Sequence, residues 1–251
     1  MYRKAARLTK LSSYLLKGKL NKGYCSICES QTLFIKKEEW LRDFYYCSRC
    51  YSIPRQRAII VALDLFCLDW RKLKIHESSP GGISSTFIQT NCPQYISTHF
   101  FQDTPLGELK DGVRCENLEE MTFENASFDL MITQDVFEHV LNPANAFREI
   151  SRVLKPGGMH IFTMPWYPQL KKTVQRAEMV DGKLKFLEEP IYHGNPIDNE
   201  GSLVTFDWGI DFTDYIYTNS GMFTTVYLVK DKTMGLEAEF LEVFISRKVA
   251  E

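Results

Sequence analysis

The sequence lacks a long hydrophobic run, a large net charge and any acidic residue in its first 22 positions. Its longest apolar stretch, residues 58–68, is interrupted by Asp64 and is far shorter than the roughly 20 residues of a membrane-spanning helix. The apolar run at residues 14–16 is too short for a secretory signal. We therefore expect a cytoplasmic protein without a membrane span.

The small net charge argues against a general affinity for nucleic acid. The 251 residues include 30 basic and 32 acidic side chains, which gives a formal charge of -2. Any contact with a phosphate backbone must therefore be local. With 44% hydrophobic and 25% charged residues, the composition is that of a globular protein with one large domain or two small ones.

The N-terminal segment, residues 1–23, is basic and contains interleaved leucines. Such a pattern is typical of an amphipathic helix that docks on an acidic partner, on RNA or on lipid head groups. A solvated basic arm is the alternative interpretation, and the sequence leaves both open. The basic residues are Arg3, Lys4, Arg7, Lys10, Lys17, Lys19 and Lys22.

Two CxxC pairs stand out among the seven cysteines, which we expect to stay reduced in the cytoplasm. Cys25 with Cys28 and Cys47 with Cys50 have the spacing of a zinc ribbon. Four thiolates complete the tetrahedral coordination of Zn²⁺, so the predicted site is structural and holds residues 24–53 together. Four unrelated buried cysteines or a redox pair are the alternatives.

Short apolar runs alternate with amphipathic stretches after a predicted linking helix over residues 54–72. This alternation is typical of a mainly parallel α/β sheet with helices on both faces. Two further apolar runs, residues 223–229 and 240–246, predict an antiparallel pair near the end of the chain. The strands that we expect in the parallel part are residues 73–77, 95–98, 113–115, 128–133 and 159–164.

The best-defined unit is residues 142–158, where Asn142 is a good helix N-cap and Pro143 fits the first helical position. Taken with Phe-Asp-Leu-Met-Ile at 128–132 and Glu-His-Val at 138–140, this unit resembles the class I S-adenosyl-L-methionine-dependent methyltransferase family, of the type 11 kind. The resemblance covers about residues 73–167. It implies a Rossmann-like, seven-stranded, mainly parallel sheet and S-adenosyl-L-methionine (SAM) as cofactor.

The resemblance puts the amino-acid part of the cofactor at the end of the first strand. Glu77 would reach the ammonium group, and the backbone amides at Ser79, Gly81 and Gly82 would hold the carboxylate. Ser79 stands where the family usually has glycine. The loop lacks the GxGxxG spacing of a dinucleotide site, which disfavours a nicotinamide enzyme.

The next two strands would bind the nucleoside. Thr98 or His99 stands where the family has an acid for the ribose hydroxyls, and each can bond a hydroxyl without a charge. Glu116, Asn117 and Leu118 correspond to the adenine edge, where an Asn or Glu oxygen can accept from the exocyclic amine.

The methyl acceptor would arrive after the fourth strand, where open α/β sheets bind their ligands. Gln134 is expected beside the cofactor and Asp135 beside the acceptor, with a helix N-cap as the alternative role of Asp135. His139 is a candidate general base. Packing within a helix is its alternative role.

The aromatic-rich residues 168–221 predict a cap over the acceptor pocket. Tyr192 and His193 lie in its most distinctive piece, Tyr-His-Gly-Asn-Pro, and are candidate substrate contacts unless the piece is only a packed lid. We predict a methyltransferase for a small molecule or natural product. The alternatives are an RNA- or protein-modifying methyltransferase that grips its substrate through the ribbon and the basic arm, and a non-enzymatic scaffold. The catalytic domain would span residues 73–251.

Overall fold

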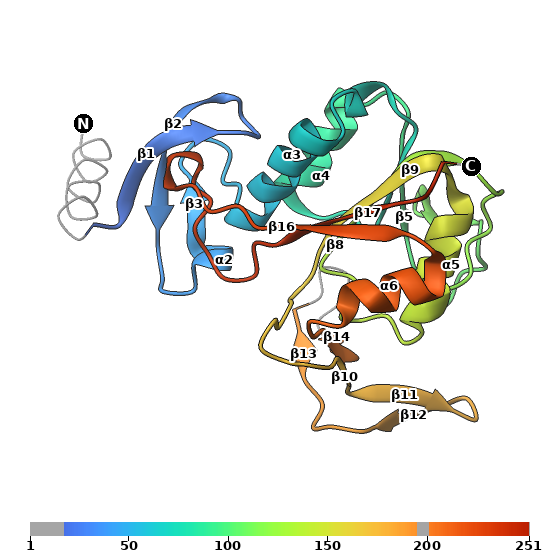
Figure 1. The fold of residues 1–251 in the computed structure, drawn as a ribbon. Coiled ribbons are helices and arrows are strands. Elements are labelled where there is room, and N and C mark those ends of the chain that lie inside the picture. Colours follow the sequence, from blue (N-terminus) through green and yellow to red (C-terminus); the bar gives the residue numbers. More distant parts are fainter. Residues whose placement is uncertain (1–17, 195–200, 251) are drawn as a thin grey trace.

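The computed structural model describes residues 18–194 and 201–250 of the chain. Its centre is one eight-stranded sheet in the order β16-β17-β9-β8-β4-β5-β7-β6 (Figure 1). The five parallel strands are β4 (Ile75–Ser78), β5 (Tyr95–His99), β7 (Val113–Cys115), β8 (Phe128–Gln134) and β9 (Leu154–Thr163). The predicted Rossmann-like α/β fold is confirmed.

The strands at the two edges of this sheet run antiparallel to their neighbours. β16 (Phe223–Tyr227) and β17 (Val243–Arg247) form the predicted closing pair, and β17 also pairs with β9. At the other edge, β6 (Leu109–Lys110) pairs with β7 and is the one strand beyond the predicted seven in the described sheet. A two-residue strand carries no periodic signal, which is why the sequence did not indicate it.

Helices cover both faces of the sheet (Figure 1). α3 (Pro54–Phe66) and α4 (Gly82–Asn91) pack on one face, and α5 (Pro143–Val153) and α6 (Phe212–Ser220) pack on the other. Strand residues alternate between the two hydrophobic cores, since Leu130 and Ile132 belong to one and Met131 to the other.

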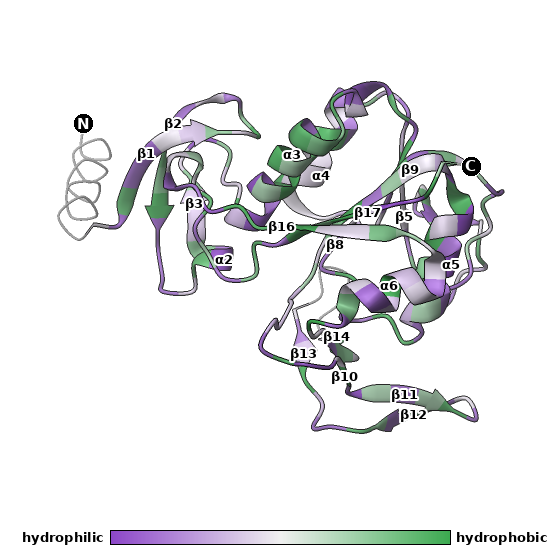
Figure 2. Ribbon diagram, viewed as in Figure 1, coloured by the Kyte–Doolittle hydropathy of each residue, from purple (hydrophilic) through white to green (hydrophobic). Residues whose placement is uncertain are grey.

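Local signals account for where the helices begin. The Asn142 side chain accepts from the Asn145 amide at 3.2 Å, and Pro143 opens α5, as predicted. α3 begins at Pro54 and is hydrophobic over most of its length (Figure 2). It ends at Phe66, before the predicted boundary at residue 72, and a short 3₁₀ turn over Trp70–Lys72 follows.

The N-terminal ribbon consists of β1 (Leu20–Cys25), β2 (Ser30–Lys36), α2 (Leu41–Phe44) and β3 (Tyr45–Cys47). It packs against the rest of the chain through the buried guanidinium of Arg57. Arg57 Nη2 donates to the Tyr45 carbonyl at 3.1 Å and to the Gly235 carbonyl at 2.7 Å. The ribbon's Phe34 and Ile132 of the sheet belong to one hydrophobic core, so the ribbon packs directly on the catalytic-type domain.

The described residues of the cap form three two-stranded pairs, and the buried Trp208 packs them against α6. The Trp208 indole stacks on Phe206 with ring centroids 5.0 Å apart and lies 4.8 Å from the Phe212 ring. The pairs are β10 (Val174–Gln175) with β15 (Phe206–Asp207), β11 (Ala177–Val180) with β12 (Lys183–Phe186), and β13 (Tyr192–His193) with β14 (Ser202–Leu203).

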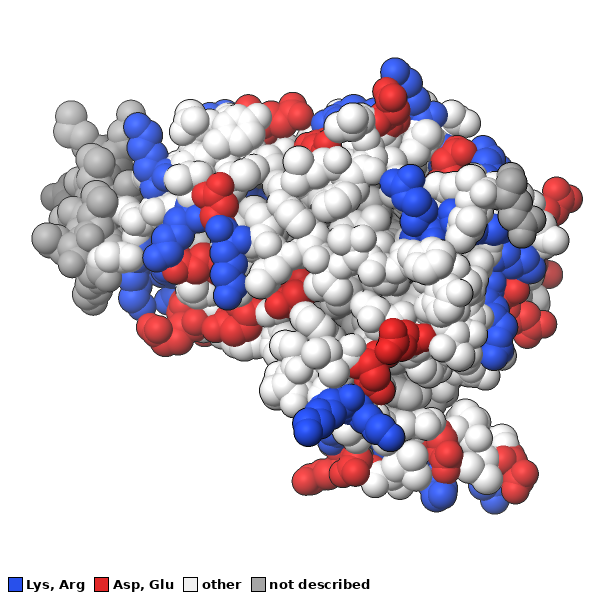
Figure 3. Space-filling model, in the orientation of Figure 1, with Lys and Arg blue, Asp and Glu red and all other residues white. Residues whose placement is uncertain are grey.

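On the face drawn in Figure 3, Lys and Arg are interspersed with Asp and Glu over the ribbon and over the β11–β12 hairpin. The predicted basic arm lies mostly outside the described residues, which begin at residue 18. None of the helices in the described part of the chain is long and apolar enough to cross a membrane.

Candidate functional site

A cavity of about 1250 Å³ opens where β4, β5 and β8 end. Its loop side is lined by residues 79–82, by residues 99–103 and by Gln134, and its cap side by His139 with residues of the cap. Single-ligand sites measure roughly 300–1,000 Å³. One continuous cavity of this volume can therefore hold a cofactor together with a small second ligand.

The loop between β4 and α4 turns sharply at Ser79, whose φ is 54°. The Ser79 amide donates to the Thr98 carbonyl at 2.8 Å, and the Gly81 amide donates to Ser85 Oγ at 3.0 Å. These two amides, which were predicted to hold the carboxylate, therefore already donate to groups of the protein. The first amides of α4, which begins at Gly82, have no acceptor within their helix, so they are available to an anion on the loop side.

Gly81 leaves a space on the loop side that a side chain would fill. A Cβ at this position would have no atom of the described chain within 4 Å, although Gly81 lines the cavity. Gly82 differs, because its Cβ would lie 2.0 Å from Gln56 Nε2 of α3. The linking helix thus reaches the loop, which the sequence did not indicate.

Glu77 stabilises this loop from the protein interior and does not face the cavity. It is fully buried, and its carboxylate accepts from Ser85 Oγ at 2.8 Å, from Gln134 Nε2 at 2.7 Å and from the Tyr95 hydroxyl at 2.6 Å. Burial raises the pKa of Glu77. In this structure Glu77 therefore does not face the cavity. It positions Gln134, which lines the cavity.

Of the two ribose candidates, the structure brings His99 to the cavity. Thr98 is fully buried, and its hydroxyl bonds His76 Nε2 at 2.9 Å, so it faces the interior. His99 lines the loop side, and its buried Nδ1 has no hydrogen-bond partner among the described residues. Burial lowers the pKa of His99. A neutral imidazole with a free nitrogen can bond a hydroxyl.

The predicted adenine contacts are engaged within the protein. The buried Glu116 carboxylate pairs with Arg114 Nε at 2.7 Å, and Asn117 Oδ1 accepts from the Glu119 amide at 3.0 Å. Leu118 belongs to the hydrophobic core. The side-chain oxygens of Glu116 and Asn117 are thus engaged within the protein, and the three adenine contacts stay a prediction.

The residues that directly follow β5, and not residues 116–118, line the cavity. Phe100 and Phe101 offer aromatic surface there, and Asp103 offers a carboxylate, which Lys110 Nζ contacts at 2.6 Å. The sequence analysis missed this segment, whose one signal is a pair of phenylalanines next to the predicted strand end.

Asp135 is held by two arginines from the N-terminal part of the chain. Its carboxylate pairs with Arg42 of α2 at 2.7 Å and with Arg55 of α3, and it accepts from Thr163 Oγ1 at 3.1 Å. Burial would raise the pKa of Asp135, but the charges of the two arginines outweigh it and lower the pKa to about 2. Asp135 is therefore neither a helix cap nor a suitable base. It ties the ribbon to the sheet beside the cavity.

His139 and His193 lie together although they come from distant segments. His139 lies in a turn before α5, not in the predicted helix, and its Nδ1 is 2.7 Å from the Leu203 carbonyl, to which it donates. This bond leaves Nε2 unprotonated, 3.8 Å from Glu138 Oε1. The imidazole of His193 stands edge-on to that of His139, with centroids 5.3 Å apart. Tyr192, the fourth predicted catalytic residue, is 55% exposed on the same strand.

Glu138 is the least solvated group of this cluster. It is 2% exposed, and burial together with the nearby charge of Asp135 raises its pKa to about 8. One ligand atom from each of Glu138, His139 and His193 lies within 4.8 Å of the others. The sequence pointed to the Glu-His pair but not to this cluster of three.

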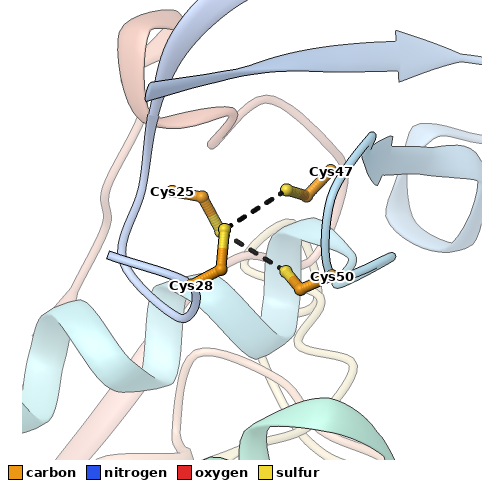
Figure 4. Close-up of side chains that lie close together, drawn as sticks. All are labelled: Cys25, Cys28, Cys47 and Cys50. Carbon is orange, nitrogen blue, oxygen red and sulfur yellow. Dashed lines mark hydrogen bonds between the residues drawn. The ribbon is translucent and has the colours of Figure 1, made fainter. Parts of the chain in front are cut away.

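The predicted cysteine quartet is assembled between β1, β3 and the turns that follow them (Figure 4). The sulfurs of Cys25 and Cys50 are 3.7 Å apart, and those of Cys28 and Cys47 are 3.8 Å apart. Four thiolates at about 2.3 Å from one Zn²⁺ ion lie about 3.8 Å from one another. The donor set and its spacing therefore fit a tetrahedral zinc site.

Comparison with known families gives one match, to a methyltransferase domain. Residues 96–162 match the family model described as a methyltransferase domain, which confirms the predicted enzyme class, a SAM-dependent methyltransferase. No curated protein sequence matches the chain.

Solved structures of similar fold are distant in sequence. A SAM-dependent methyltransferase of Mesorhizobium loti is 16% identical over 76% of this chain and 98% of that chain, with a TM-score of 0.48. DesVI of Streptomyces venezuelae is 10% identical over 78% and 92%, with a TM-score of 0.49. The 1,6-didemethyltoxoflavin-N1-methyltransferase of Burkholderia thailandensis, bound to S-adenosylhomocysteine, is 14% identical over 78% of each chain, with a TM-score of 0.45. At these values the likeness carries no argument about the acceptor.

Proposed function

We propose that the protein transfers the methyl group of SAM to a small-molecule acceptor bound beneath the cap. The observation that carries this proposal is the single cavity of about 1250 Å³ whose lining joins Gly81 on the loop side to Leu203 on the cap side. A ligand that spans the loop side and a second one under the cap would share this space. A space lined on one side by residues of the cap suits a small acceptor.

On the loop side, the amino-acid carboxylate of SAM would lie against the first amides of α4, where the helix dipole also favours a negative charge. The His99 imidazole and the Asp103 carboxylate, which both line the loop side, are the groups that would bond the ribose hydroxyls. The rings of Phe100 and Phe101 would pack against the adenine. This assignment replaces the predicted contacts at Thr98 and at residues 116–118.

SAM, when bound, supplies a methyl group that its sulfonium centre has already activated. The chain must then orient the acceptor in line with the carbon–sulfur bond and keep water out. Thr205, whose hydroxyl donates to the Val140 carbonyl at 2.7 Å, holds the cap against the sheet beside the cavity. His139 presents an unprotonated Nε2 at the cap side, where it is able to hold an acceptor proton.

We also propose that the cysteine quartet binds a structural Zn²⁺ ion, supported by sulfur separations of 3.7 and 3.8 Å. Metal analysis of purified protein tests this. We expect the double variant Cys25→Ser/Cys47→Ser to contain one zinc ion less per chain than the wild type. The matched control is Cys92→Ser, since Cys92 is a buried free thiol outside the quartet. Equal zinc contents in all three proteins would contradict the assignment.

A macromolecular acceptor has less support from the described residues. The ribbon, which would grip such a substrate, uses Phe34 and the residues around Arg57 for packing against the sheet. Its visible surface mixes charges of both signs (Figure 3). A salt-sensitive complex with RNA would favour this alternative.

Calorimetric titration with SAM tests the proposed function. We expect the wild type to bind one SAM and Gly81→Val to bind it at least about tenfold more weakly, a loss of about 1.4 kcal/mol, because the new side chain would fill the cofactor's space. Gly194→Val is the matched control, since it makes the same change in open space on the cap side and should leave SAM binding intact. Absence of heat with the wild type would contradict the proposal.

A further inference from the structure

We infer that Glu138, His139 and His193 form a second metal site, for a divalent transition ion, beside the acceptor part of the cavity. The inference rests on the proposed function, because the ion would hold an oxygen of the methyl acceptor. The site differs in chemistry from the cysteine quartet, since its donors are two imidazoles and one carboxylate.

The geometry of the three side chains suits one ion. Glu138 Oε1 and His139 Nε2 are 3.8 Å apart, a distance that an ion about 2.1 Å from each atom can span. His193 approaches from the β13–β14 pair, and its ring stands at 90° to that of His139. Ligands from a turn of the core and from the cap therefore converge on one point.

The carboxylate of Glu138 supplies a second and independent observation. Glu138 is 2% exposed, yet its Oε2 is without a hydrogen-bond partner in the described structure. Arg42 and Arg55 bond the neighbouring Asp135 instead. A buried carboxyl group without a partner is costly unless it is protonated or coordinates a metal, and a cation bound here would take the place of the proton.

The bond between His139 and the cap prepares its other nitrogen for a metal. His139 Nδ1 donates to the Leu203 carbonyl at 2.7 Å, which fixes the ring and leaves Nε2 as the free donor. Histidines that bind metals almost always donate their second nitrogen in this way. Because β14 carries Leu203 and pairs with β13, which carries His193, the same hairpin supplies one ligand and orients another.

Three protein ligands leave coordination positions open, as in catalytic metal sites. His139 and Gly194, the neighbour of His193, line the cap side of the cavity. The acceptor class that fits is therefore a molecule with a hydroxyl or carboxylate oxygen able to bind the ion. Because the ion would occupy His139 Nε2, His139 would then be a ligand and not a base, and a hydroxyl bound to the ion would lose its proton to solvent. Its lone pair then forms the carbon–oxygen bond while the carbon–sulfur bond breaks and leaves its electron pair on sulfur.

Calorimetric titration with Zn²⁺ alone tests the site, on protein whose cysteine quartet is already loaded with zinc. We expect the wild type to bind one additional ion. His193→Ala should lose at least about 100-fold in affinity, because removal of a group that merely orients a ligand already costs 10–100-fold. Since His193 lies on the surface, this variant should fold. Glu138→Gln, which keeps the shape of the side chain, should show the same loss.

Tyr192→Phe is the matched control, since Tyr192 is exposed on the same short strand and should leave zinc binding unchanged. A wild type that binds no additional zinc, or a His193→Ala variant that binds it as the wild type does, would overturn the inference. SAM binding measured on the same samples separates the two proposals. If SAM binds and the additional zinc does not, only the metal site is wrong; if zinc binds and SAM does not, the proposed function is wrong.

Discussion

The loop side and the cap side of the cavity are built in different ways. The loop side comes mostly from one stretch of chain, residues 75–103, in which strand ends, a turn and a helix start lie next to one another, with Gln134 added from the end of β8. The cap side draws on the ribbon through Arg42, on the linking helix through Arg55 and on the cap through Leu203. The loop side thus follows the common pattern of the fold, whereas the cap side, where we propose that the acceptor binds, is assembled from distant segments.

The ribbon and the linking helix contact both sides of the cavity. Arg42 and Arg55 reach across to Asp135, and Gln56 lies against Gly82. A change in the ribbon should therefore alter the structure of the cap side more than that of the loop side.

Removal of zinc from the cysteine quartet should have the largest effect. Structural zinc contributes on the order of 10 kcal/mol to the folding of small ribbons, and here the ribbon shares its core with the sheet. We expect a chelator to lower the thermal midpoint of the whole protein in a single transition, followed by circular dichroism. Two separate transitions, with that of the sheet unmoved, would show that the ribbon folds independently.

Asp135→Ala should have the next largest effect, because it leaves the buried Arg42 without its partner. Removal of one member of a buried ion pair costs about 3–5 kcal/mol, measured as the free energy of unfolding in urea. Lys72→Ala is the control, since the Lys72–Asp69 pair is on the surface and its loss should leave stability unchanged. If the two variants were equally stable, Asp135 would not tie the ribbon to the sheet.

Acid should destabilise the sheet beneath both sides of the cavity, and each buried histidine should contribute less than the loss of Asp135. Burial lowers the pKa of His160 and of His76 to about 3, whereas both titrate near 6.5 in the unfolded chain. Between these values the unfolded state binds more protons, so stability falls as the pH falls from 6.5 toward 3. At pH 5 each histidine should cost about 2 kcal/mol relative to pH 7.

His160→Gln removes one of these titrating groups. We expect its unfolding free energy, measured in urea at both pH values, to decline less on acidification than that of the wild type. Equal declines would mean that the buried histidine does not contribute to the acid sensitivity.

Local patterns in the sequence were sufficient to predict the parallel strands, the cap of α5 at Asn142, the turn at residues 79–82 and the cysteine quartet. Each depends on residues that are close in the sequence or on a fixed spacing. The choice between Thr98 and His99 needed the orientation of a strand, because neighbouring side chains point to opposite faces. The partners of Asp135 needed long-range packing, which no local pattern records.

Amide hydrogen exchange in the presence and absence of SAM tests the central claim, that the cofactor occupies the loop side. The account predicts slower exchange at residues 79–84 and 99–103 when SAM is present, with little change in the ribbon strands β1–β3. Unchanged exchange at residues 79–84, with SAM at saturating concentration, would contradict it.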